Sequence, residues 1–127
     1  MTELVLHLPL PPPLSALTKN VDRVGRPKTK RYNAWISLAY FRAREQRPYP
    51  RFGKANVIAD YQLGKPDRRR ADVMNREKAL SDMLVRLDVI EDDSQIVDLR
   101  MRWADVDGAV ITIRPAPVLR SPEGIAG

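Results

Sequence analysis

Apolar and polar residues alternate near the start of the chain, with the period of two that a pleated β-strand requires. Leu4, Leu6 and Leu8 fall on one side of this pattern. The alternation predicts a strand over residues 3–8. Pro9 opens a proline-rich segment, and proline ends a strand because it cannot donate to a β-ladder.

Two longer segments, residues 32–46 and 73–87, instead repeat their apolar residues three and four positions apart. This spacing places the apolar side chains along one stripe of an α-helix. In the second segment the stripe consists of Leu80, Met83, Leu84 and Leu87. Trp35 lies on the stripe of the first segment, so it is expected in the core rather than stacked on a base. Both segments are predicted to be helices that bury one face.

Three further segments are predicted to be strands, at residues 54–63, 95–103 and 109–114. The apolar face of the middle one is expected to carry Val97, Leu99, Met101 and Trp103. Ile96 is placed on its opposite face, and Asp107-Gly108 predicts the turn that joins the last two strands. The element order is β-α-β-α-β-β. It favours an α+β (mixed α/β) fold in which two helices cover one side of a four-stranded mixed sheet.

The length of 127 residues suits a single domain. Residues 1–114 are predicted to form it. Within it, residues 14–31 are basic and lack apolar periodicity, so they are predicted to be a flexible loop. Residues 115–127 are rich in proline and glycine and are predicted to be a frayed tail.

Composition narrows the chemistry open to the chain. The absence of cysteine excludes disulfides, zinc–thiolate sites and cysteine nucleophiles, and the single histidine, His7, cannot build a multi-histidine metal site. No apolar run approaches the roughly 20 residues of a membrane span, and no signal peptide is visible. A cytoplasmic protein without a membrane partner is therefore expected.

The net charge of +6 indicates a polyanionic partner, and nucleic acid is the commonest one. Many of the cations fall in residues 14–31, where the only acid is Asp22. They are Lys19, Arg23, Arg26, Lys28, Lys30 and Arg31. This segment is predicted to contact nucleic acid, and the alternative interpretation is a merely solvated loop.

The stretch from Pro66 to Lys78 brings phosphate-binding and metal-binding residue types together. It contains Arg68, Arg69, Arg70, Asp72, Asn75 and Lys78. A second acidic cluster, Glu91-Asp92-Asp93, follows where the second helix should end. Cations grip phosphates, and clustered carboxylates hold a hard divalent metal through oxygen. The two together favour metal-assisted chemistry on a phosphodiester.

Each of these residues also has a purely structural interpretation. Asp72 is well placed to cap the second helix, a role that stabilises a helix by about 1 kcal/mol without any metal. The acidic cluster could be a solvated turn. Asp82 is expected to be a helix-surface residue paired with Arg86. Met74 lies away from the apolar stripe, in a position where a polar residue would be expected.

The run from Pro66 to Asn75, continued by Lys78, Asp82 and residues 92–97, resembles the RusA-type Holliday junction resolvases. The segment Leu8–Ser15 and the basic loop after it are also similar to that family, so the resemblance covers roughly residues 4–114. It implies a homodimeric, Mg²⁺-dependent endonuclease that cuts four-way DNA junctions symmetrically in recombination and repair. Enzymes of this family are often carried by bacteriophages and prophages.

The resemblance also implies roles for individual residues. Asp72 and Asp93 match catalytic, metal-binding aspartates, Lys78 matches an active-site lysine, and Asn75 matches the asparagine of an Asp-x-Asp-Asn core. Asp92 is a further metal-ligand candidate. Met74 occupies the position of the middle aspartate, and a thioether is a poor ligand for Mg²⁺.

Three explanations for Met74 stay open. Another carboxylate, from Asp67, Glu91 or Asp92, supplies the missing oxygen. The protein binds junctions without cutting them. Or Met74 is a substitution that inactivates the enzyme.

Three functions are therefore compared. A junction endonuclease should nick four-way DNA with Mg²⁺. A non-cutting branched-DNA binder should bind junctions tightly and give no product. A basic RNA-binding or duplex-binding domain should show no preference for junctions over linear duplex, and it would have no use for the acidic cluster.

Overall fold

The computed structural model describes residues 2–19 and 27–118. Within them the chain folds in the order β-α-β-α-β-β, as predicted. The main elements are β1 (Leu4–Leu8), α1 (Lys30–Glu45), β2 (Val57–Gly64), α2 (Glu77–Arg86), β3 (Ile96–Ala104) and β4 (Ala109–Pro115). Three single-turn 3₁₀ helices accompany them, η1 (Leu14–Ala16), η2 (Val73–Arg76) and η3 (Asp93–Gln95).

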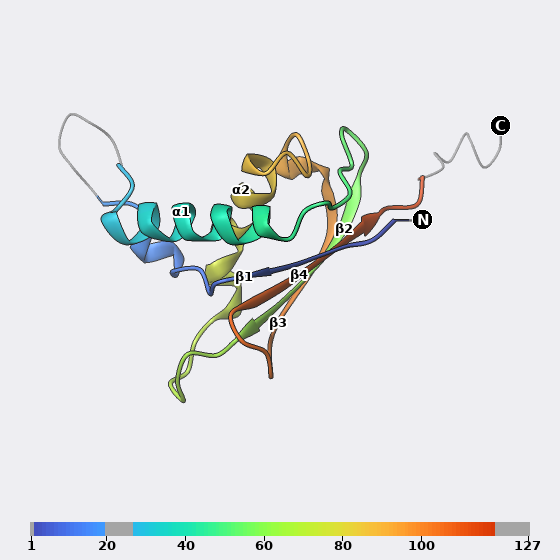
Figure 1. Cartoon of the computed structure of the whole chain (residues 1–127). Helices are drawn as coiled ribbons and strands as arrows, with labels where there is room; N and C mark the ends of the chain where they lie inside the picture. The colour runs from blue at the N-terminus through green and yellow to red at the C-terminus, as the bar shows by residue number, and fades with distance from the viewer. Residues whose placement is uncertain (1, 20–26, 119–127) are drawn as a thin grey trace.

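The four strands form one mixed sheet in the order β1-β4-β2-β3 (Figure 1). Only β2 and β3 are parallel, and α2 lies on the connection between them. One face of β1, β2 and β4 is fully buried, and its side chains form a single core with the buried residues of both helices. On the other face Val5 is 46% exposed. The predicted α+β fold, with both helices on one side of the sheet, is confirmed.

The edge strand β3 departs from the predicted alternation. A bulge falls at Val97, because Val57 pairs with Ile96 and Ile58 pairs with Asp98. Val97 is therefore 48% exposed. Ile96 pairs with the buried Val57 of β2 and packs against the core. The expected places of Val97 and Ile96 were wrong, since an extra residue in one strand breaks the period of two. Beyond the bulge, Leu99, Met101 and Trp103 pack against the core as predicted.

The basic segment has more structure than expected. Thr29 caps α1 by accepting a hydrogen bond from the backbone N–H of Tyr32 at 3.1 Å, so that Lys30 and Arg31 form the first turn of the helix rather than part of a loop. Thr18 and Lys28 form an isolated antiparallel bridge. Residues 20–26, and with them Arg23 and Arg26, lie outside the described residues, as do residues 119–127 of the predicted tail.

The predicted second helix consists of η2 followed by α2. At its C-terminal end, Val89 N–H donates to Leu84 C=O and Asp88 N–H donates to Val85 C=O, which is the Schellman arrangement. Asp88 takes the left-handed conformation that this ending needs, with φ of 62°. The chain is thereby turned directly into the acidic segment. No helix in the described part of the chain is long and apolar enough to cross a lipid bilayer.

Candidate active site

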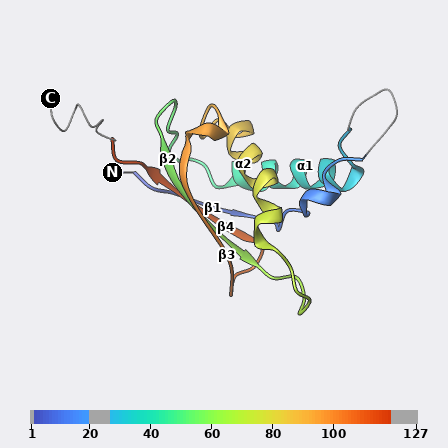
Figure 2. The ribbon, with the colours of Figure 1, turned by 180° about the vertical axis from the view of Figure 1, so that it is seen from behind.

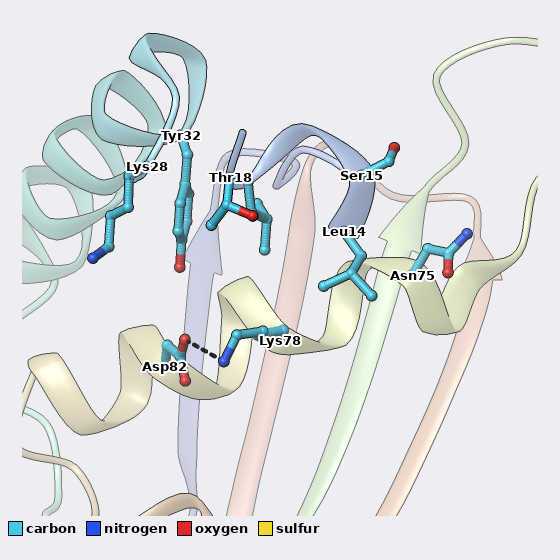
Figure 3. Close-up of a pocket in the computed structure, with 9 residues that line it drawn as sticks. Leu14, Ser15, Thr18, Lys28, Tyr32, Asn75, Lys78 and Asp82 are labelled. Carbon is cyan, nitrogen blue, oxygen red and sulfur yellow. Dashed lines mark ion pairs between the residues drawn. The ribbon is translucent and has the colours of Figure 1, made fainter. Parts of the chain in front are cut away.

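Three adjoining cavities lie along one side of α2 and together form a groove. The largest, of about 680 Å³, is enclosed by α2, the segment around η1 and the beginning of α1. Figure 3 shows Lys78 and Asp82 on α2 facing Tyr32 across this cavity, with Leu14 on the η1 side. Cavities of about 230 and 410 Å³ adjoin it, and Asp93 lines both.

The 230 Å³ cavity contains four of the residues at positions that the family resemblance assigns to the active site. It is lined by Leu14, Met74, Asn75, Glu77, Lys78 and Asp93. The contributions come from η1, from the contiguous helices η2 and α2, and from η3. These three parts of the chain are separated in sequence and meet only in the folded protein. Asn75, Lys78 and Asp93 are therefore brought together. We call this cavity the carboxylate pocket.

Asp72 does not line the carboxylate pocket. Its side chain caps η2 by accepting a hydrogen bond from the backbone N–H of Met74 at 3.0 Å. The capping interpretation of Asp72 is confirmed, while its role as a metal ligand stays a prediction. The cap fixes the start of η2 and thereby the position of Met74, which is 52% exposed at the pocket.

Asp92 and Asp93 are presented by a tightly bonded turn. Asp92 caps η3, and its carboxylate accepts hydrogen bonds from the backbone N–H of Ser94 at 2.9 Å and from the Ser94 hydroxyl. These bonds favour the ionised form and hold the pKa of Asp92 below its usual range. Asp92 lines the 410 Å³ cavity beside Asp93 and Lys28. Both aspartates are exposed and therefore accessible to a cation from solvent.

Gln95 holds this turn in place, and its role was missed in the sequence. Its side-chain oxygen accepts from the backbone N–H groups of Glu91 and Asp92, at 2.8 and 2.9 Å. Its amide donates to the carbonyls of Gly53 and Ala55, both at 2.7 Å. Asp92 and Gln95 together form a capping box, a pattern that the spacing Asp-x-x-Gln could have revealed.

Lys78 pairs with Asp82 at 3.3 Å, one turn further along α2. The expected pairing of Asp82 with Arg86 is wrong, because within the described residues the carboxylate of Asp82 faces the groove and Lys78 instead. The hydrogen bond and charge of Asp82 raise the pKa of Lys78. Lys78 is therefore a fixed cation at neutral pH and not a proton acceptor.

The arginine loop between β2 and η2 projects from the end of the sheet where β3 turns into β4 (Figure 1). Asp67 accepts two hydrogen bonds from the Arg69 guanidinium, at 2.8 and 3.1 Å, and this pairing lowers the pKa of Asp67. Arg68 and Arg70 are exposed. Trp103 donates its indole N–H to the carbonyl of Ala71 at 3.1 Å, which ties the loop's end to β3.

Three further polar residues, one that lines the groove and its two buried partners, were missed. Glu77 lines the carboxylate pocket, and its carboxylate accepts a hydrogen bond from Ser81, which in turn is bonded to Tyr61 at 2.9 Å. Ser81 and Tyr61 are 1% and 0% exposed. Their contact joins residues 20 positions apart, so local sequence patterns carry no sign of it.

The described residues hold no group of three or more histidine, cysteine, aspartate or glutamate side chains that could hold a metal ion by themselves. The carboxylate pocket nevertheless offers hard oxygen donors in Glu77, Asp93 and Asn75. Mg²⁺ is commonly held by only one or two carboxylates together with substrate phosphates and water. The donor set of this pocket fits that mode of binding.

Comparison with known protein families gives a match to the family described as endodeoxyribonuclease RusA, over residues 11–114. The match includes every element of the groove, and the chain belongs to the RusA endodeoxyribonuclease family. This is a family of nucleases that act on branched DNA as Holliday junction resolvases. A search of the curated proteins gave no match.

Proposed function

We propose that this protein is a structure-selective endonuclease that resolves four-way DNA junctions by symmetric, Mg²⁺-dependent strand cleavage, acting as a homodimer. The observation that carries the proposal is the carboxylate pocket in a chain of the RusA family. It brings the Asp93 carboxylate of η3 to the same surface hollow as the amide and the lysine of the η2–α2 segment. A domain that only binds duplex nucleic acid has no need of that arrangement.

Nucleases of this family generally depend on a divalent metal. Asp93 lines the carboxylate pocket together with Asn75, and it would hold Mg²⁺ there. When bound, the metal would polarise the scissile phosphodiester and lower the pKa of a water molecule for attack. Asp92, in the adjoining cavity, would add negative charge without contributing directly to the carboxylate pocket.

The cations of the groove have separate tasks. Lys78 lines the carboxylate pocket and keeps its charge, so it stabilises the negative charge that develops on phosphate oxygens in the transition state. Lys28 lies further along the groove and would contact a flanking phosphate. Arg68 and Arg70 are exposed on their projecting loop and would hold a more distant part of the DNA backbone.

A second candidate function is branched-DNA binding without cleavage, and Met74 favours it. Its side chain lines the pocket where the family resemblance implies a carboxylate. The thioether is a soft, weak donor, and its presence removes one negative charge from a site for a hard cation. This candidate differs from the first in one measurable respect, the appearance of cut product.

The test uses a four-way junction and a linear duplex of the same sequence, each in EDTA and in Mg²⁺, with the wild type and the Asp93→Asn variant. The matched control is Asp98→Asn, which changes an exposed aspartate of β3 away from the groove. We expect junction-selective binding by all three proteins, and Mg²⁺-dependent cleavage by the wild type and Asp98→Asn only. Equal binding to junction and linear duplex would contradict the proposal.

A further inference from the structure

Glu77 is the second carboxylate of the carboxylate pocket. It lies three residues after Met74, about one turn further along the continuous helical segment of η2 and α2, and lines the same pocket as Asp93. Within the described residues, neither Glu77 nor Asp93 forms an ion pair with a lysine or arginine. Lys78 lines the same pocket, but its ammonium group pairs with Asp82 at 3.3 Å. The charges of Glu77 and Asp93 repel each other in the pocket, and a bound divalent cation would relieve that repulsion.

The side chain of Glu77 is held in position by the buried hydroxyl groups of Ser81 and Tyr61. Ser81 donates its proton to one oxygen of the Glu77 carboxylate, so the Tyr61 hydroxyl, 2.9 Å from Ser81, must be the donor in their contact. Burial above all, with help from the charges of Glu77 and Asp93, raises the pKa of Tyr61, which keeps it a donor. The hydrogen bonds thus run from Tyr61 to Ser81 and from Ser81 to one carboxylate oxygen of Glu77, so the other oxygen of Glu77 is available to a ligand in the pocket.

This arrangement is unusual for a serine inside a helix. Such a serine commonly turns its hydroxyl back to the carbonyl four residues earlier. Ser81 instead bonds to the side chain four residues earlier and is itself anchored to the middle of β2. Ser81 and Tyr61 thus restrict the rotamers of Glu77, which lowers the entropy that a bound cation would have to remove.

We propose that Glu77 and Asp93 together bind the divalent cation, with Glu77 supplying the carboxylate that is missing at position 74. The inference rests on the proposed function for the use of a metal, and it names the residue that makes the pocket competent despite Met74. A glutamate reaches one methylene further than an aspartate, which suits a ligand from the next turn of the helix. Ser81 is then a positioning residue that acts through Glu77.

The test measures Mn²⁺ binding to the full-length protein in the absence of DNA, by the loss of the free-ion electron paramagnetic resonance signal. Glu77→Gln keeps the oxygen that accepts from Ser81 but removes the charge. We expect it to weaken Mn²⁺ binding at least tenfold and Ser81→Ala to weaken it less. Glu45→Gln, an exposed glutamate at the end of α1, should change it by less than twofold.

Rescue adds a result that a merely structural role of Glu77 would not produce. In the double variant Met74→Asp/Glu77→Gln, a carboxylate at position 74 should restore Mn²⁺ affinity to within about threefold of the wild type. Unchanged affinity in Glu77→Gln, or loss in Glu91→Gln instead, would overturn the inference. If the wild type binds Mn²⁺ through Glu77 yet never cuts a junction, the proposed function fails and this inference stands.

Discussion

The acidic turn should depend on Gln95 more strongly than on any aspartate within it. Gln95 is 8% exposed and makes four hydrogen bonds with its side-chain amide, two as acceptor and two as donor. The donor pair reaches the loop before β2, and Figure 2 shows that loop beside the acidic turn at one end of the sheet. Gln95→Glu keeps the size and the acceptor oxygen but replaces both donors with a carboxylate oxygen.

The cost follows from the bonds that are lost. Each hydrogen bond contributes about 1 kcal/mol net, so losing both donor bonds removes about 2 kcal/mol. The new carboxylate oxygen also faces the carbonyls of Gly53 and Ala55, and leaving such groups unsatisfied costs at least about 1 kcal/mol more. We expect Gln95→Glu to lower the free energy of unfolding by about 3 kcal/mol in total.

Urea unfolding measures this directly, with Gln62→Glu as the matched control. Gln62 lies half-buried on the outer face of β2, away from the acidic turn, so the same change of charge there should alter stability by less than about 0.5 kcal/mol. Gln95→Glu should also weaken Mn²⁺ binding, because a displaced acidic turn would move the Asp93 carboxylate with it. A stability change below about 0.5 kcal/mol for Gln95→Glu would refute the reasoning.

Three further predictions concern charges around the groove. Lys78→Met should lower the rate of junction cleavage by about 10²-fold or more with little effect on junction binding, measured by single-turnover cleavage and gel shift; an unchanged rate would remove Lys78 from the chemistry. Ser94→Ala should destabilise the protein at pH 7, because the hydrogen bonds from Ser94 lower the folded-state pKa of Asp92. In urea unfolding, the difference in stability from the wild type should be present above pH 3.8 and should vanish as the pH falls through the lowered pKa. A difference that persists at lower pH would contradict this. Arg76→Met should lower the free energy of unfolding by about 2 kcal/mol, since the Arg76 guanidinium donates to the carbonyl of Pro11; thermal unfolding that matches the wild type would count against it.

Much of the fold follows from periodicity in the sequence. The six main elements could be predicted because the apolar residues of each recur with a regular period, and the groove's basic and acidic residue types were visible as clusters. The bulge at Val97 could not be predicted, because the alternation of Val97, Leu99 and Met101 in the sequence is as regular as that of an unbroken strand. The first turn of α1 was assigned to the basic loop because Lys30 and Arg31 are charged, although Thr29 is a recognisable N-cap.

The candidate site was predictable in its residue types and less so in its connections. Asn75, Lys78 and Asp93 were identified and do line one pocket. Glu77 and Gln95 were not, since their roles depend on partners brought close by the fold, Tyr61 through Ser81 in one case and the carbonyls before β2 in the other. These long-range contacts leave no local pattern, although the Asp92–Gln95 capping box has a recognisable spacing.

The central claim is tested most directly by strand-specific labelling of a four-way junction incubated with the wild-type protein and Mg²⁺. Our account predicts paired nicks at symmetric positions in two opposing strands, none in EDTA, and no need for an aspartate at position 74. Junction binding without product in the wild type, with cleavage appearing only in Met74→Asp, would contradict it and identify a resolvase fold that binds branched DNA without cutting.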